Sequence, residues 1–144
     1  MAVFKDYDEL HSCMGQLYTE AKSDSRIAPK IKDSNLVIQF RYDDPHATVT
    51  INAAAPPTQP GAYFDVLWGD DIGLKPNVEM SMKADVAHSF WHGKINLMAA
   101  LARRQIVAKG PIPKILKLLP AVEPMYAMYP RILHEIGRDD LIIK

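Results

Sequence analysis

Residues 78–119 read VEMSMKADVAHSFWHGKINLMAALARRQIVAKGPIPKILKLL, and the spacing of the apolar side chains changes along them. Over 78–82, apolar residues alternate with polar ones, which predicts a strand with one buried face. Over 83–92, the apolar side chains form one arc at about 100° per residue, which predicts a helix, and Gly93 could end it with a left-handed cap. Further along, the pattern predicts a short helix over 97–103, a strand over 105–109 and a proline-broken helical segment after Gly110.

Upstream of this stretch, the pattern predicts a helix and then an antiparallel hairpin. Apolar residues recur at helical spacing over 6–22, and Asp6 with Glu9 resembles a capping box at the start of that helix. Ala28-Pro29 is expected to be extended or a turn, because proline restricts the residue before it. Alternating apolar residues over 36–42 and 47–53 predict two closely linked strands.

A further strand is expected over 62–68, with Phe64, Val66 and Trp68 on one face. Strands thus run together before the later helices, which favours an α+β fold. We expect a five-stranded, mostly antiparallel sheet that helices cover on one face, with an apolar cavity between the two layers. We find no repeat, low-complexity tract or domain boundary, so residues 1–144 are expected to form a single domain.

The composition excludes several classes of protein. The 17 basic residues balance 17 acidic ones, and no aromatic and basic interleaving is present, so nucleic acid is not an expected partner. The single cysteine, Cys13, excludes an internal disulfide. No apolar run approaches the roughly 18 residues of a membrane span, and none of the signal-peptide type lies near residue 1. The sequence therefore predicts a cytoplasmic location.

The quoted stretch resembles the sterol carrier protein family of lipid-transfer domains. The matching features are an alternating strand, an acid-bearing helix, a Gly-Lys step, an apolar helix, a short strand ending in glycine and a Leu-rich helix. They correspond to residues 78–82, Asp85, Gly93-Lys94, 97–101, 106–110 and 116–119. Arg104-Gln105 stands where the family usually has glycine. The resemblance implies a non-catalytic carrier of a lipid-like ligand (fatty acid, fatty acyl chain, isoprenoid or sterol-like), with no cofactor.

Apolar side chains on the predicted sheet and helices could enclose a ligand. Methionine suits such a site because it adapts to irregular contents. The same residues could instead form an ordinary packed core. As ligand-binding candidates we name Phe64, Val66, Trp68, Met80, Met82, Phe90, Leu97, Met98, Leu101 and Ile106, with Leu118, Met125 and Tyr129 as a lid.

A large cavity cannot be both open and empty. An empty apolar void costs about 24 cal/mol per Å³, so ~400 Å³ would cost on the order of 10 kcal/mol. That rivals the whole stability of a small domain. We therefore expect any large cavity either to hold lipid or to be closed by collapse of the C-terminal segment.

Positive charge is concentrated between residues 83 and 119, where the sequence has seven basic residues and only one acidic residue, Asp85. These charges could simply be solvated, or they could form a rim that meets anionic headgroups or a membrane surface. We define the basic rim as Lys94, Arg103, Arg104, Lys109, Lys114 and Lys117.

Two alternatives to a carrier remain. Asp85, His88 and His92 share one helix face at a spacing that can hold a metal or an acid–base centre, which would fit an enzyme acting on a lipid-like substrate. That face lies opposite the apolar arc, so we expect these side chains to be exposed and without metal. Alternatively, the apolar faces could bind a protein partner or a second copy of the chain, giving a homodimer without ligand.

Overall fold

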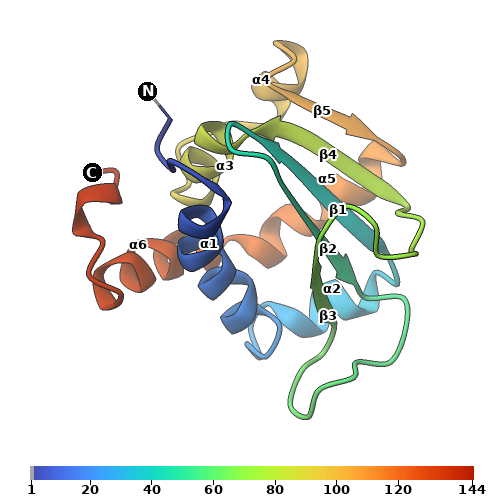
Figure 1. Cartoon of the computed structure of the whole chain (residues 1–144). Helices are drawn as coiled ribbons and strands as arrows, with labels where there is room; N and C mark the ends of the chain where they lie inside the picture. The colour runs from blue at the N-terminus through green and yellow to red at the C-terminus, as the bar shows by residue number, and fades with distance from the viewer. Residues whose placement is uncertain (1) are drawn as a thin grey trace.

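Five strands form one mixed sheet, and helices cover its inner face (Figure 1). The computed structural model describes residues 2–144. The elements in chain order are α1 (Tyr7–Ala21), α2 (Ala28–Asp33), β1 (Val37–Asp43), β2 (Ala47–Asn52), β3 (Asp65–Trp68), β4 (Val78–Lys83), α3 (Ala84–Trp91), α4 (Leu97–Ala102), β5 (Ile106–Lys109), α5 (Ile112–Val122), α6 (Met125–Glu135) and the short 3-10 helix η1 (Asp139–Leu141). No helix within residues 2–144 is long and apolar enough to cross a bilayer.

The sheet has the order β3-β2-β1-β4-β5, which confirms the expected five-stranded, mostly antiparallel arrangement. β1 pairs with β2 as the predicted hairpin and is parallel to β4, while β3 and β5 are antiparallel edge strands. Because side chains alternate along each strand, Ile38, Phe40 and Tyr42 share a face with their register partners Val78, Met80 and Met82. This is the inner face, and it contributes much of the core.

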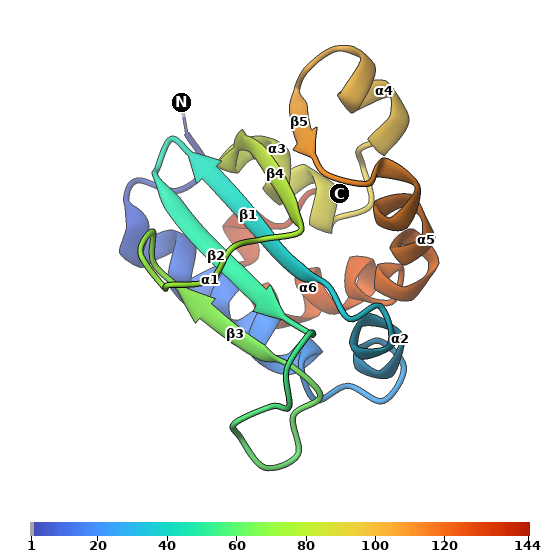
Figure 2. The same ribbon diagram turned by 90° about the vertical axis from the view of Figure 1, so that its right-hand side faces the viewer.

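The connection from β3 to β4 crosses the outer face of the sheet (Figure 2). It has to cross the sheet because β3 lies at one edge and ends beside Val49 of β2, whereas β4 lies beyond β1 and begins beside Ile38. Asp70 of this connection accepts a hydrogen bond from the Thr48 hydroxyl. The outer face is therefore not simply solvated, and the buried Gln39 side chain there donates to Thr50 Oγ1 at 3.1 Å.

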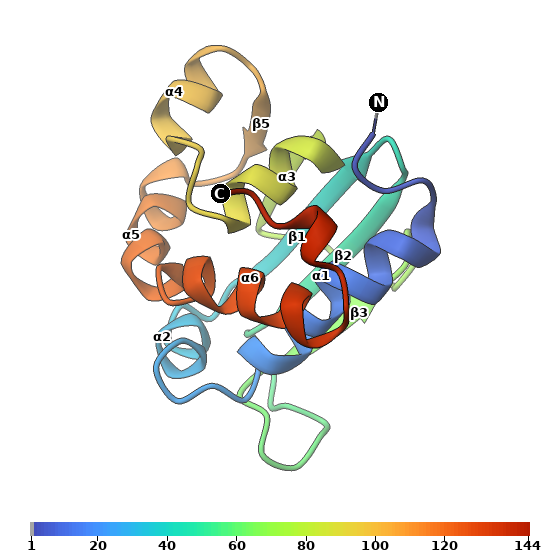
Figure 3. The same cartoon turned by 90° about the vertical axis from the view of Figure 1, so that its left-hand side faces the viewer.

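The helical layer consists mainly of α1, α3, α5 and α6, which lie in front of the sheet in Figure 3. α1 packs against α6, and α3 contacts both α6 and the central strands. The Asp6 carboxylate caps α1 by accepting from the Glu9 amide at 2.9 Å. Glu9 in turn accepts from the Lys5 amide rather than from Asp6 as in a strict capping box.

Residues with positive φ shape the turns in the quoted stretch. Gly93 has φ +73°, and its amide and that of Lys94 donate to Phe90 and Ser89, which makes a Schellman cap on α3 as the sequence indicated. Arg104, where glycine is usual in the sterol carrier family, has φ 59°. The turn between α4 and β5 therefore has a left-handed backbone at a residue other than glycine.

One element was predicted wrongly. Residues 28–33 form α2 rather than an extended segment or turn. Pro29 lies in the first turn of this helix, where its missing amide hydrogen costs nothing because those amides have no intrahelical acceptor. The strand expected over 62–68 is shorter, since regular pairing begins at Asp65.

Gly110 gives a test of the close approach between the start of α5 and β4. Its φ is +115°, and a Cβ there would lie 2.4 Å from the carbonyl oxygen of Asn77. We expect Gly110→Ala to lower the free energy of unfolding by about 4 kcal/mol, because the obstacle is backbone. Gly61→Ala, at φ +79° with nothing within 4 Å, should lower it by only about 1 kcal/mol. Urea unfolding measures the free energy of unfolding of each variant. Equal decreases in the two variants would show that the close approach of Gly110 to Asn77 does not affect stability.

Candidate functional site

An apolar cavity of about 60 Å³ lies between the inner face of the sheet and the helices. Its lining comes from α1, α2, every strand except β3, and helices α3 to α6. The lining residues are Tyr18, Ala21, Ile31, Ile38, Phe40, Tyr42, Ile51, Phe64, Val78, Met80, Met82, Phe90, Trp91, Leu97, Ile106, Ile115, Leu118, Leu119, Val122 and Met125. None of them is charged. A volume of this size holds a few water-sized groups and is far too small for a lipid chain.

Most of the side chains named from the sequence line this cavity. They are Phe64, Met80, Met82, Phe90, Leu97, Ile106, Leu118 and Met125. Their alternation on strands or arc on helices already placed them on inward faces. Among the other lining residues, Ile31 was not predicted from the sequence, because the helix that carries it, α2, was not predicted either.

Five candidates lie elsewhere. Met98 is 57% exposed on α4, which packs beside β5 at the edge of the sheet, so its assignment to the wall is wrong. Leu101, on the same short helix, is half-buried outside the cavity lining. Val66 and Trp68 are on edge strand β3, where Trp68 packs edge-on against His11 of α1. Tyr129 of α6 is fully buried in the core and is not among the residues that line the cavity.

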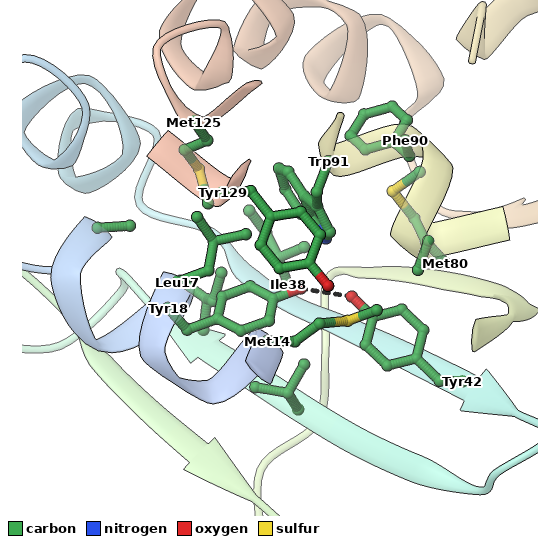
Figure 4. Packing of buried hydrophobic residues seen from close by; sticks show 14 of the residues in the cluster. Met14, Leu17, Tyr18, Ile38, Tyr42, Met80, Phe90, Trp91, Met125 and Tyr129 are labelled. Carbon is green, nitrogen blue, oxygen red and sulfur yellow. Dashed lines mark hydrogen bonds between the residues drawn. The ribbon is translucent and has the colours of Figure 1, made fainter. Parts of the chain in front are cut away.

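Four aromatic side chains form what we call the aromatic wall of the cavity: Tyr18, Phe40, Tyr42 and Trp91. Their rings contact one another, with centroids 5.9 Å apart for Tyr18 and Trp91 and 6.1 Å apart for Phe40 and Tyr42. The hydroxyls of Tyr18 and Tyr42 are hydrogen-bonded to each other (Figure 4). Burial raises the pKa of Tyr42 to about 12 and also raises that of Tyr18 well above its usual value, so both are neutral at physiological pH.

A second hollow, which we call the side groove, opens on the surface next to the cavity. Its volume is about 340 Å³, and it lies between the α3–α4 connection and the α5–α6 junction. It is lined by Phe90, Ile95, Leu97, Leu119, Pro120, Glu123 and Tyr126. Phe90, Leu97 and Leu119 also line the cavity, so these shared side chains stand between the interior and the surface.

All six members of the basic rim are exposed. They lie on or beside α4, β5 and α5, which gather at one end of the molecule (Figure 2). Within the described part of the chain, none of the six forms an ion pair. Lys94 adjoins Ile95 of the side groove, and no acidic residue occurs between Asp85 and Glu123.

The prediction that His88 and His92 are exposed is wrong, because they are only 2% and 8% exposed. The C-terminal residues pack over them: His88 Nε2 donates to the Leu141 carbonyl at 2.7 Å, and the Ile143 amide donates to His92 Nε2 at 3.2 Å. This contact spans about fifty residues of sequence, so periodicity on one helix could not indicate it.

The same hydrogen bonds leave no free nitrogen on either histidine. His88 Nδ1 accepts from the Tyr129 hydroxyl, and His92 Nδ1 donates to the His88 carbonyl. Asp85 accepts from the Val3 amide at 2.8 Å. Over residues 2–144, no group of three His, Cys, Asp or Glu side chains is placed to hold a metal ion. The three residues therefore hold the two ends of the chain against α3, an arrangement that does not favour the alternative of a lipid enzyme centred on them.

The buried histidines predict a pH dependence of stability. Burial lowers the pKa of His88 to about 4 and also lowers that of His92. An unfolded histidine has a pKa of about 6.5, so the unfolded chain binds more protons between these values. The free energy of unfolding should thus be at its full value above about pH 6.5 and fall towards about pH 4.

Urea unfolding at a series of pH values measures this fall. His88→Gln keeps a donor for the Leu141 carbonyl and cannot titrate, so it should flatten the dependence. His11→Gln, at an exposed position, should not. An unchanged slope in His88→Gln would contradict the assignment.

Comparison with known proteins identifies the fold. No protein-family model matches the chain, and no curated protein matches its sequence. Among solved structures, apo sterol carrier protein 2 from Yarrowia lipolytica matches over 86% of each chain, at 15% identity and a TM-score of 0.52. The sterol carrier protein domain 2 of Helicoverpa armigera matches over 81% of this chain and 89% of its own, at 15% identity and a TM-score of 0.60.

A third structure, described as the UbiJ-SCP2 ubiquinone synthesis protein, matches over 77% of this chain and 85% of its own. The identity is 10% and the TM-score 0.50. The strand order, the helical cover on one face and these matches confirm the resemblance seen in residues 78–119 at the level of fold. The chain has the sterol carrier protein fold.

Proposed function

We propose that this protein binds a lipid-like ligand non-covalently between the sheet and the helices and transfers it without chemical change. The ligand classes expected are a fatty acid, a fatty acyl chain, an isoprenoid or a sterol-like molecule. The observation that carries the proposal is the uncharged cavity enclosed by apolar side chains from both layers. A bound chain would gain roughly 0.8 kcal/mol for each methylene buried there.

The cavity must enlarge to admit such a ligand. At about 24 cal/mol per Å³, the observed void costs only about 1.4 kcal/mol, whereas an open one of ~400 Å³ would be prohibitive when empty. The small volume fits an arrangement in which the C-terminal helices are closed over the site. The movable part would be α5 and α6, since Pro120 and Pro130 interrupt their backbone hydrogen bonds and Leu118, Leu119 and Met125 line the cavity.

The side groove is the proposed entrance, because only side chains separate it from the cavity. Separation of α5 from the α3–α4 connection would join the two hollows. The ligand would then be received or released beside Lys94, at the basic rim.

The basic rim supports transient contact with an anionic membrane surface. Its unpaired charges would be attracted to acidic headgroups, and the exposed Met98 lies among them on α4. The likeness to a protein described as a ubiquinone synthesis protein keeps an isoprenoid among the ligands to be tested.

A pair of variants tests the position of the binding site. Leu118→Trp fills the cavity, so we expect the affinity for an apolar fluorophore to fall at least about tenfold, which corresponds to about 1.4 kcal/mol. Met98→Glu places a charge on α4 outside the cavity and should leave that affinity unchanged. Fluorescence titration measures binding, and circular dichroism checks folding. The site is misplaced if Leu118→Trp binds normally or if Met98→Glu does not bind.

Charge reversal tests the membrane contact separately. The double variant Arg103→Glu/Arg104→Glu should weaken co-sedimentation with vesicles containing anionic lipid several-fold, since each basic residue near such a surface contributes about 1 kcal/mol. It should leave fluorophore binding in solution intact. Lys30→Glu/Lys75→Glu changes the net charge equally at exposed positions outside the rim. If vesicle co-sedimentation fell equally in both double variants, only the net charge of the protein would determine its membrane binding.

A further inference from the structure

The tyrosine pair of the aromatic wall is unusual in a lining that is otherwise almost wholly apolar. Tyr18 comes from α1 and Tyr42 from β1, and both side chains are about 1% exposed. Phenylalanine at either position would supply the same ring without bringing a hydroxyl into the interior. Each of the two hydroxyls therefore needs a hydrogen-bond partner, because a buried polar group without one destabilises the fold.

The partners present do not use all the hydrogen-bond donors of the pair. Each tyrosine hydroxyl carries one hydrogen. One of the two hydrogens lies in the bond between Tyr18 and Tyr42, and the other needs an acceptor elsewhere. Trp91 cannot serve, because its indole N–H only donates.

No other acceptor is in place. Among the hydrogen bonds within residues 2–144, each of the two hydroxyls has only the other as its partner. The Tyr129 hydroxyl is hydrogen-bonded to His88 Nδ1 at 2.8 Å and forms no hydrogen bond with Tyr18 or Tyr42. One O–H donor of the aromatic wall is thus left for an acceptor that the cavity could receive.

The charge of the lining restricts what that acceptor can be. No lysine, arginine or histidine is among the residues that surround the cavity. An ionised carboxylate placed there would lose its hydration without gaining a cation, which is strongly unfavourable. A carbonyl, ether or hydroxyl oxygen would accept the available hydrogen at much smaller cost in hydration.

We propose, on the basis of the proposed function, that the Tyr18–Tyr42 pair selects a neutral lipid carrying one hydrogen-bond acceptor oxygen at its buried end. The oxygen meets the aromatic wall, and the hydrocarbon chain extends between sheet and helices toward the side groove. The pair thereby discriminates against lipids that carry an ionised headgroup inward.

Three ligands of equal chain length test this inference: tridecane, 2-tridecanone and tridecanoate. Displacement of the apolar fluorophore gives the affinity of each for the wild type and for Tyr18→Phe/Tyr42→Phe. Removing the hydroxyls should weaken the ketone about five- to tenfold, as expected for one neutral hydrogen bond, and should not weaken the alkane. Tridecanoate should bind most weakly at about pH 8 and gain affinity as its carboxyl is protonated at lower pH.

Tyr63→Phe is the matched control, since Tyr63 is 38% exposed and outside the cavity lining, and it should retain the wild-type affinity for the ketone. The inference is overturned if the double variant binds the ketone as well as wild type, if ketone and alkane weaken equally, or if ionised tridecanoate binds as tightly as the ketone. Failure of all three ligands and the fluorophore to bind wild type would instead reject the proposed function. Urea unfolding shows whether the double variant is folded.

Discussion

The account depends on two apolar layers that meet without interlocking completely. The inner face of the sheet presents Ile38, Phe40 and Met80 near its centre, and α5 and α6 lie opposite it. Protein interiors are normally packed as densely as organic crystals, so a void at this contact marks a place where the layers are held less firmly. The helical layer there is also the part of the chain in which prolines interrupt the helices. Loose packing and interrupted helices together make this contact the place where we propose that the fold opens.

The polar groups around this contact differ between the buried side and the surface side of the proposed site. The Tyr18 and Tyr42 hydroxyls lie in the aromatic wall, whereas Glu123 and the basic rim lie at the surface near the side groove. The buried histidines have a different role, because their nitrogens hold the C-terminal residues against α3. The groups that secure the ends of the chain are therefore distinct from those that we propose meet a ligand.

Local sequence pattern was enough to predict the central strands, α1 with its Asp6 cap, α3 with its Gly93 cap, and eight of the residues that line the cavity, because alternation and helical arcs are read from neighbouring residues. It failed where distant segments decide the outcome. Met98 lies on an apparently apolar helix that packs at the sheet edge, and Trp68 lies on an edge strand that contacts α1. His88 is buried by residues about fifty positions away. Pro29 marked a break in the pattern, although proline is also suited to a first helical turn.

Native mass spectrometry of the gently purified protein, before and after organic extraction, tests the central claim most directly. The account predicts either a copurified lipid that extraction removes or a ligand-free protein that takes up one equivalent of an added neutral lipid. A protein that carries no lipid, takes up none and retains a rigidly closed interior would contradict it, as would a ligand-free dimer formed through the same apolar faces.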